Sequence, residues 1–184
     1  LFFIVLSIVC AASTFEGITS DSISLDNQLI LAVKEGNYED SVDLIKRGAD
    51  VNFLDFYGNT TLHLAVLGRH ESIVDALIDA HFKNVDAVDS YGYTALQTAA
   101  ANGLVVSVSK IISAGANINA VDERLSETAL HLAIMNGHVE VTRILLAQAA
   151  INTEIKNCFG KTPREITNFT TFSRLFEEYD MKKI

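Results

Sequence analysis

Residues 57–65 read YGNTTLHLA, and this stretch decides the fold because the chain repeats it. Copies follow as YGYTALQTA at residues 91–99, LSETALHLA at residues 125–133 and FGKTPREI at residues 159–166. The threonine of each copy comes 34 residues after the threonine of the copy before: Thr60, Thr94, Thr128 and Thr162. Self-similarity at a fixed period of this length indicates an array in which each unit packs on its neighbours.

Each copy also has the residues of a helix start followed by an apolar stripe. Its threonine offers an oxygen that can cap the first turn, and Pro163 stands at a first helical position, which tolerates proline. Leu62, Leu64 and Ala65 begin a stripe with helical spacing. A second apolar-periodic segment follows each first helix, and glycines close these helices. The turns between units open with turn-forming residues: Asp55, Asp89, Asp122 and Asn157.

The period of 33 to 34 residues with a T-x-L-H core resembles the ankyrin-repeat family. The resemblance covers residues 25–180 and implies an all-α solenoid of stacked helix-turn-helix units with short β-hairpin turns. The first unit lacks the T-x-L-H core and the last replaces it with charged residues, as terminal caps do. We expect about five repeats, with these bounds: 25–54, 55–88, 89–121, 122–156 and 157–184.

Some turns depart from the repeat and predict irregular backbone. Where the family pattern has glycine directly before histidine, Arg69 stands between Gly68 and His70. Ser126 takes the place of a turn glycine in the fourth unit. Residues 80–85 lack the Gly-Ala-Asp-Val pattern that closes other units.

The first residues of the chain differ from the rest. Residues 1–12 are apolar or small and carry no charge, and polar chain follows from Thr14. This pattern predicts a secretory signal peptide over residues 1–13, and therefore a secreted protein. The chain starts at Leu1 without a basic stretch, so we interpret the signal as N-terminally incomplete. Two alternatives stay open: a longer upstream apolar run would make a membrane anchor, or the segment is neither.

Charge and cysteine content narrow the partners. The net charge is −9, which disfavours nucleic-acid backbones and anionic membrane surfaces. A basic protein surface is favoured instead, and its association would weaken with salt.

Cys10 lies in the predicted signal, so the mature chain keeps only Cys158 and has no internal disulfide. Glycosylation sequons at Asn59 and Asn168 agree with secretion.

No combination of residues indicates catalysis, a metal or a cofactor. The chain contains no G-x-S-x-G, P-loop or H-E-x-x-H motif. His63 and His131 look like a ligand pair, but they are two repeats apart and Gln97 holds the place between them. The resemblance implies that this histidine makes a hydrogen bond within its own turn. We therefore predict a protein that is not an enzyme and binds no cofactor.

The resemblance also implies where a partner protein binds: at the tips of the turns and along the exposed side of the first helices. Phe56, Tyr57, Tyr91 and Tyr93 form an aromatic group on adjacent turns, which serves either as interface anchors or as mutual packing that stiffens the turns. A glycan at Asn59 would obstruct this region. The predicted partner-binding residues are Phe56, Tyr57, Val66, Leu67, Tyr91, Tyr93, Asn102, Arg124, Met135 and Asn136.

These observations predict a non-enzymatic, secreted protein-protein interaction module. By analogy, secreted ankyrin-rich proteins include venom proteins such as the latrotoxins and effectors passed between organisms. Three alternatives remain: an inhibitory or regulatory subunit, a fragment of a larger ankyrin-rich toxin or effector, and a membrane-attached adaptor that keeps residues 1–13.

Overall fold

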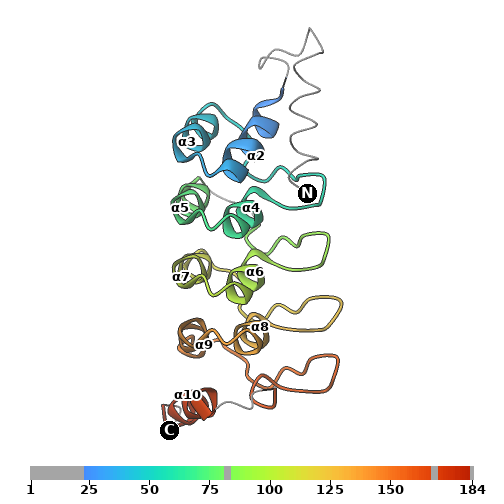
Figure 1. Cartoon of the computed structure of the whole chain (residues 1–184), viewed down its shortest axis with the longest axis vertical. Coiled ribbons are helices and arrows are strands. Elements are labelled where there is room, and N and C mark those ends of the chain that lie inside the picture. Colours follow the sequence, from blue (N-terminus) through green and yellow to red (C-terminus); the bar gives the residue numbers. More distant parts are fainter. Residues whose placement is uncertain (1–22, 81–83, 167–169, 183–184) are drawn as a thin grey trace.

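The computed structural model describes residues 23–80, 84–166 and 170–182 as a stack of paired helices (Figure 1). The predicted signal at residues 1–13 and the sequon at Asn168 lie outside these residues. All regular elements in the described part are helices, which confirms the all-α solenoid. The expected β-hairpins reduce to two isolated bridges, Leu54 with Thr60 and Val88 with Thr94.

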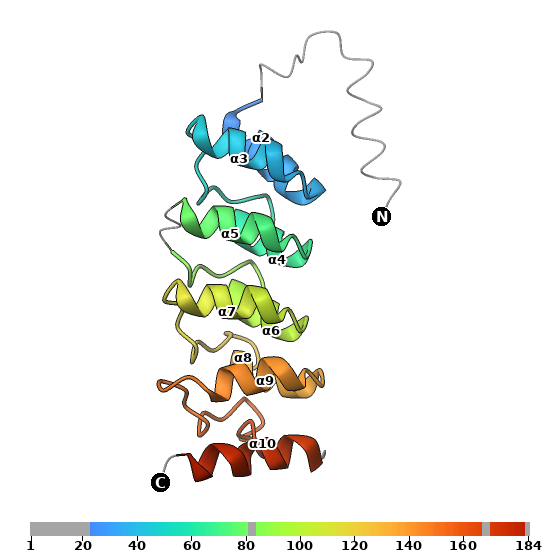
Figure 2. The ribbon, with the colours of Figure 1, turned by 90° about the vertical axis from the view of Figure 1, so that its left-hand side faces the viewer.

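The helices form two columns, and Figure 2 views the stack from the side of the outer column. The inner column, beside the projecting turns, consists of α2 (Leu25–Glu35), α4 (Thr61–Leu67), α6 (Ala95–Ala101) and α8 (Ala129–Met135). The outer column consists of α3 (Tyr38–Lys46), α5 (Glu71–Asp79), α7 (Val105–Ser113), α9 (Val139–Leu146) and α10 (Thr170–Met181). One apolar core runs between the columns from the first repeat to α10.

The repeated threonines begin the inner helices as predicted. The hydroxyl groups of Thr60, Thr94 and Thr128 accept hydrogen bonds from the backbone N–H groups three residues later. Each cap satisfies a donor that has no partner inside the helix, which fixes the start of α4, α6 and α8 at the same point of each repeat. The inner helices therefore stay in register along the stack.

From the second repeat onward, a buried side chain ties each repeat to the next. His63 Nε2 lies 3.0 Å from the backbone carbonyl oxygen of Tyr93. Gln97 Nε2 donates to the backbone carbonyl oxygen of Glu127 over 2.7 Å. His131 Nε2 lies 3.1 Å from the backbone carbonyl oxygen of Lys161. Because a carbonyl oxygen only accepts, each histidine carries its proton on Nε2. We call these three side chains the inter-repeat ladder.

The two ladder histidines are also bonded within their own turns, as the resemblance implied. Nδ1 of His63 lies 2.8 Å from the Thr60 hydroxyl, and His131 Nδ1 lies 2.8 Å from the Thr128 hydroxyl. Burial lowers the pKa of His63 and of His131, although the facing carbonyl groups and nearby carboxylates oppose it. Both rings are therefore neutral structural groups at pH 7.

Two of the three predicted irregular turns are confirmed, and residues 81–83 of the third lie outside the described residues. Arg69 has φ 60° and Ser126 has φ 55°, in the left-handed region that favours glycine. At the position that corresponds to Arg69, the first repeat has Gly36 with φ 74°. Arg69 and Ser126 therefore hold a backbone conformation that costs an L-residue about 1 kcal/mol.

The last repeat differs from the prediction. Residues 163–166 form turns, so Pro163 does not begin a helix there. The backbone N–H of Thr162 still donates to Glu165, and the N–H of Glu165 to the Thr162 hydroxyl, as in a helix cap. The residues after this cap are charged instead of apolar, so no stripe drives a helix against the core. The repeat packs through α10, whose Phe172 and Phe176 are buried.

Candidate functional site

Four turns project from the inner column, and we call them fingers (Figure 1). Each finger opens with a side chain that holds its backbone. Asp89 Oδ1 accepts the N–H groups of Tyr91 and Tyr93 over 2.9 and 3.0 Å, and Asp55 Oδ1 accepts those of Tyr57 and Asn59. The aromatic residues are therefore presented on a braced backbone. The fingers comprise residues 55–60, 89–94, 122–128 and 157–162.

Two fingers and three inner helices, α4, α6 and α8, line a cleft of about 670 Å³, which we call the tyrosine cleft. Finger 55–60 contributes Tyr57, and finger 89–94 contributes Tyr91 and Tyr93. Leu67 at the end of α4 also lines it. The remaining lining residues are polar or small, apart from one leucine: Asn59, Asp89, Gln97, Thr98, Ala101, Asn102 and Leu132.

Five predicted binding residues meet in this cleft: Tyr57, Leu67, Tyr91, Tyr93 and Asn102. Four more are exposed but lie outside it: Phe56, Arg124, Met135 and Asn136. The ring of Phe56 is 96% exposed and packs edge-on against Tyr57, with ring centroids 5.5 Å apart. The contact confirms mutual packing for this pair, and the role of these exposed rings as interface anchors stays a prediction.

The assignment of Val66 to the binding surface is wrong. Its side chain is fully buried, whereas that of its neighbour Leu67 is 54% exposed. The helix α4 lies between α2, α5 and α6, so every residue of α4 except Leu67 is covered. In α4 and α8 only the last residue, Leu67 or Met135, is exposed, whereas α6 also presents Thr98, which lines the cleft.

Sequence reasoning assigned Asp89 to the turn alone and missed its place in the cleft. Its Oδ1 braces the finger, but the described residues give its Oδ2 no hydrogen bond or ion pair. The corresponding Asp55 is different, since its Oδ2 pairs with Lys34 over 2.9 Å. Burial acts to raise the pKa of Asp55, but Lys34 and backbone N–H groups outweigh it and hold that pKa below its usual value. Comparing positions between repeats would have revealed this difference.

The neighbouring finger 122–128 carries a buried carboxyl group. Glu127 is 1% exposed and its Oε1 has no hydrogen-bond partner among the described residues. Burial and the adjacent Asp122 raise the pKa of Glu127, although Asn157 opposes the shift. Burial and the same carboxylates raise the pKa of Tyr93, which keeps its hydroxyl group protonated. Tyr93 therefore offers the cleft a neutral ring and a hydrogen-bonding hydroxyl group.

Comparison with known proteins identifies the repeat. A sequence model described as "Ankyrin repeats (3 copies)" matches residues 29–122 and 106–166, which is more than half of the chain. The chain belongs to the ankyrin-repeat family. This ankyrin fold is a non-enzymatic protein-protein interaction module, as the sequence predicted.

The chain is also similar to segments of several longer proteins. The chain is 30% identical to the nuclear factor NF-kappa-B p105 subunit of Gallus gallus over 80% of its own length and 15% of that protein. It is 29% identical to the Mus musculus p105 subunit over 65% of its length and 12% of that protein. It is 32% identical to neurogenic locus notch homolog protein 1 of Xenopus tropicalis, over 75% of its length and 5% of that protein. The chain thus spans a small part of each relative.

Asn59, the first residue of a glycosylation sequon, lines the tyrosine cleft. The side-chain nitrogen of Asn59, which would carry a glycan, donates to both carboxylate oxygens of Asp55 over 3.2 and 3.3 Å. The following Thr60 is buried and caps α4. A glycan on Asn59 would therefore replace one of these hydrogen bonds and stand at the rim of the tyrosine cleft.

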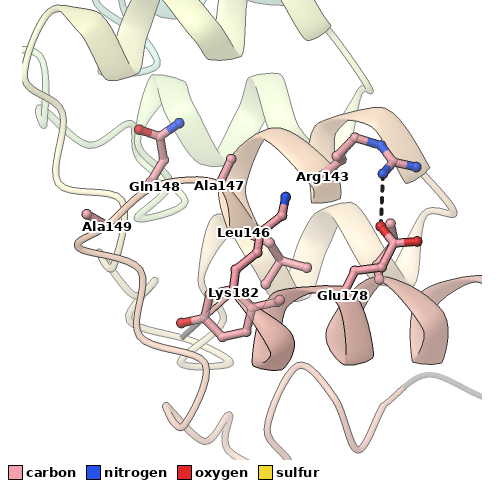
Figure 3. Close-up of a pocket in the computed structure, with 9 residues that line it drawn as sticks. Arg143, Leu146, Ala147, Gln148, Ala149, Glu178 and Lys182 are labelled. Atoms are coloured by element: carbon pink, nitrogen blue, oxygen red, sulfur yellow. Dashed lines mark hydrogen bonds and ion pairs between the residues drawn. The ribbon is translucent and has the colours of Figure 1, made fainter. Parts of the chain in front are cut away.

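A second cleft of about 440 Å³ lies between α9 and α10 of the ankyrin array (Figure 3). Arg143 of α9 pairs with Glu178 of α10 over 3.4 Å, and Lys182 lines the same cleft. The Arg143–Glu178 pair joins the last two outer helices, so the residues of this cleft have a structural role in the array.

In the described residues, no three His, Cys, Asp or Glu side chains are arranged to bind a metal. No described helix is long and apolar enough to span a bilayer.

Proposed function

We propose that this protein binds an extended segment of a partner protein in the tyrosine cleft and across the adjacent fingers. The cleft carries the proposal, because three tyrosines and an exposed leucine converge on a braced backbone. Tyrosine gives large contact area with few rotatable bonds, so it is enriched at interface centres. The net charge of −9 favours a basic partner surface.

A photo-crosslinking experiment tests this surface. Tyr91 and Tyr38 are 58% and 48% exposed, but Tyr38 belongs to the outer helix α3. Replacing each separately with p-benzoylphenylalanine gives two probes of similar exposure. We expect irradiation to join a protein partner specifically to the Tyr91 probe. The same adducts from both probes, or adducts from Tyr38 alone, would contradict the proposed surface.

We further propose that the protein is secreted, on the strength of the uncharged apolar pattern in residues 1–13. The full-length gene expressed in secretory cells would release the protein into the medium. Mass spectrometry should find a new N-terminus near Ser13 or Thr14. A protein that stays in the cell with residues 1–13 intact would overturn secretion, and would favour a membrane-attached adaptor if it sediments with membranes.

A regulatory or inhibitory subunit is the second candidate. It is favoured by similarity to p105, a protein named as a subunit. An inhibitor would suppress the activity of the partner crosslinked at Tyr91, whereas a scaffold would leave it unchanged. A fragment of a larger ankyrin-rich toxin or effector is a further alternative, which rests on the analogy with secreted ankyrin-rich proteins. The length of the full gene decides that alternative.

A further inference from the structure

We propose that the tyrosine cleft receives a lysine or arginine side chain of the partner, which pairs with Asp89 between the tyrosine rings. This inference rests on the proposed function, because it names the chemistry that the same cleft selects. It comes from a comparison of equivalent positions in the first and second repeats.

The first repeat already holds a cation at the equivalent place. Lys34, near the end of the inner helix α2, reaches across to finger 55–60 and pairs with Asp55 Oδ2 over 2.9 Å. Asp55 also braces its finger through Oδ1, as Asp89 does in the next finger. A basic side chain thus fits between the end of an inner helix and the aspartate of the following finger.

The second repeat has the same frame without the cation. Leu29 and Val33 of α2 correspond to Leu62 and Val66 of α4, and all four are buried. The left-handed residue after each helix is Gly36 in the first repeat and Arg69 in the second. These matches place Leu67 at the position of Lys34. Leu67 cannot pair with Asp89, so a carboxylate oxygen remains available where the cleft opens.

The later fingers do not offer this acceptor. Asp122 uses Oδ1 for the N–H groups of Arg124 and Leu125 and Oδ2 for the N–H of Glu127. Finger 157–162 has the neutral Asn157 at this position. Among the four described fingers, the first therefore has a cation, Lys34, that pairs with its aspartate. The second has an aspartate without such a cation, and the other two have no free carboxylate oxygen for a cation to pair with.

The walls of the cleft suit a cation. Asp89 is the single charged residue among those that line it, so an uncompensated negative charge faces the cleft. Lysine and arginine bind favourably over the faces of tyrosine rings, and three tyrosines line this space. The carboxylate of Asp89 and the faces of the tyrosine rings each attract a basic side chain, and neither attracts an acidic one.

The test uses the whole chain and synthetic peptides. Four peptides would carry one central residue between glycine and serine flanks: lysine, arginine, citrulline or norleucine. Citrulline keeps the shape of arginine without its charge, and norleucine keeps the apolar stem of lysine. NMR titration of the ring signals of Tyr57, Tyr91 and Tyr93 gives the affinity. We expect a basic peptide to shift these signals and to bind about fivefold to tenfold tighter than its neutral counterpart.

Three variants locate the effect. Asp89→Asn removes the charge, and Asn157 supports the same finger bonds with Phe159 and Lys161, so the variant should fold. Leu67→Lys supplies a cation from within the chain, as Lys34 does for Asp55. Both should weaken binding of the basic peptides about fivefold or more. Val106→Lys adds the same charge at an exposed position of the outer helix α7, which does not line the cleft, and should leave binding unchanged.

Several outcomes overturn the inference. It fails if norleucine and citrulline bind as well as lysine and arginine, if no peptide moves the tyrosine signals, or if Asp89→Asn binds the basic peptides normally. These results leave the broader proposal standing as long as the Tyr91 probe still crosslinks its partner. Loss of the Tyr91 adducts would instead count against the binding surface itself.

Discussion

The inter-repeat ladder and the tyrosine cleft use the same repeat in opposite ways. At the ladder, positions 63, 97 and 131 carry His, Gln and His, and each side chain reaches the carbonyl group of the following finger. Near the ends of the inner helices, the equivalent positions 34, 67, 101 and 135 carry Lys, Leu, Ala and Met, and positions 67 and 101 line the cleft. The buried position keeps one chemical role, while the exposed one changes in every repeat. The interior therefore holds the stack together, while the exposed surface is free to differ from repeat to repeat.

The largest test of this contrast compares two leucines. Leu96 is 1% exposed in α6 and Leu67 is 54% exposed in α4. Leu96→Ala should cost about 2–5 kcal/mol of unfolding free energy, because it leaves a cavity in the core. Leu67→Ala should stay within about 0.5 kcal/mol of the parent protein. Urea denaturation followed by circular dichroism measures both, and equal losses would contradict the contrast.

A second test breaks one step of the ladder. Gln97→Leu leaves the buried carbonyl oxygen of Glu127 without this donor, and should cost about 1–3 kcal/mol. Gln97→His should be close to neutral, because histidine makes the equivalent bond at positions 63 and 131. The two variants would be compared by urea denaturation. If the histidine variant were as unstable as the leucine variant, the ladder would not be a repeated device.

A third test uses pH. Because burial lowers the pKa of His63 and His131 in the folded state, the unfolded chain takes up protons first as pH falls through its ordinary histidine pKa of about 6.5. The stability that these two neutral histidines contribute is fully present above that pH and is lost as the pH falls below it. We expect the melting temperature to fall between about pH 7 and pH 5, with a loss on the order of 1 kcal/mol.

The double variant His63→Gln/His131→Gln is the matched control for the pH test. Gln97 makes the ladder bond without a titrating group, so the double variant should keep its fold and show a weaker pH dependence over the same range. Equal pH dependence in both proteins would assign the effect to other groups. The raised pKa of Glu127 acts in the opposite direction, because its protonated form is the one that the folded state favours.

The smallest expected effect is a gain in stability. Ser126→Gly relieves a serine at φ 55° and should stabilise the protein by about 1 kcal/mol. Ser109→Gly, inside α7, should instead cost about 0.5–1 kcal/mol, because glycine weakens a helix interior. Thermal melting of the two variants gives the comparison. A loss of stability in Ser126→Gly would show that the serine side chain contributes more than its backbone conformation costs.

The sequence alone determined the stack, the starts of α4, α6 and α8, and the irregular turns at Arg69 and Ser126. Each depends on contacts within one repeat. A threonine caps a backbone N–H group three residues later, and an aspartate accepts N–H groups two to four residues later. An irregular turn arises where another residue occupies the position of a glycine. Interactions of such short span leave a periodic pattern that can be read along the chain.

Only the tertiary structure decided which side chains form the cleft. Leu67 and Asp89 belong to different repeats and come together because an inner helix packs beside the following finger. Val66 carries the same apolar character as Leu67, and only the neighbouring helices determine that one is buried and the other exposed. Pro163 stands in a good helical start, yet the charged residues after it give that helix nothing to pack against. Local pattern fixes the backbone, whereas burial by neighbouring repeats determines which side chains reach a partner.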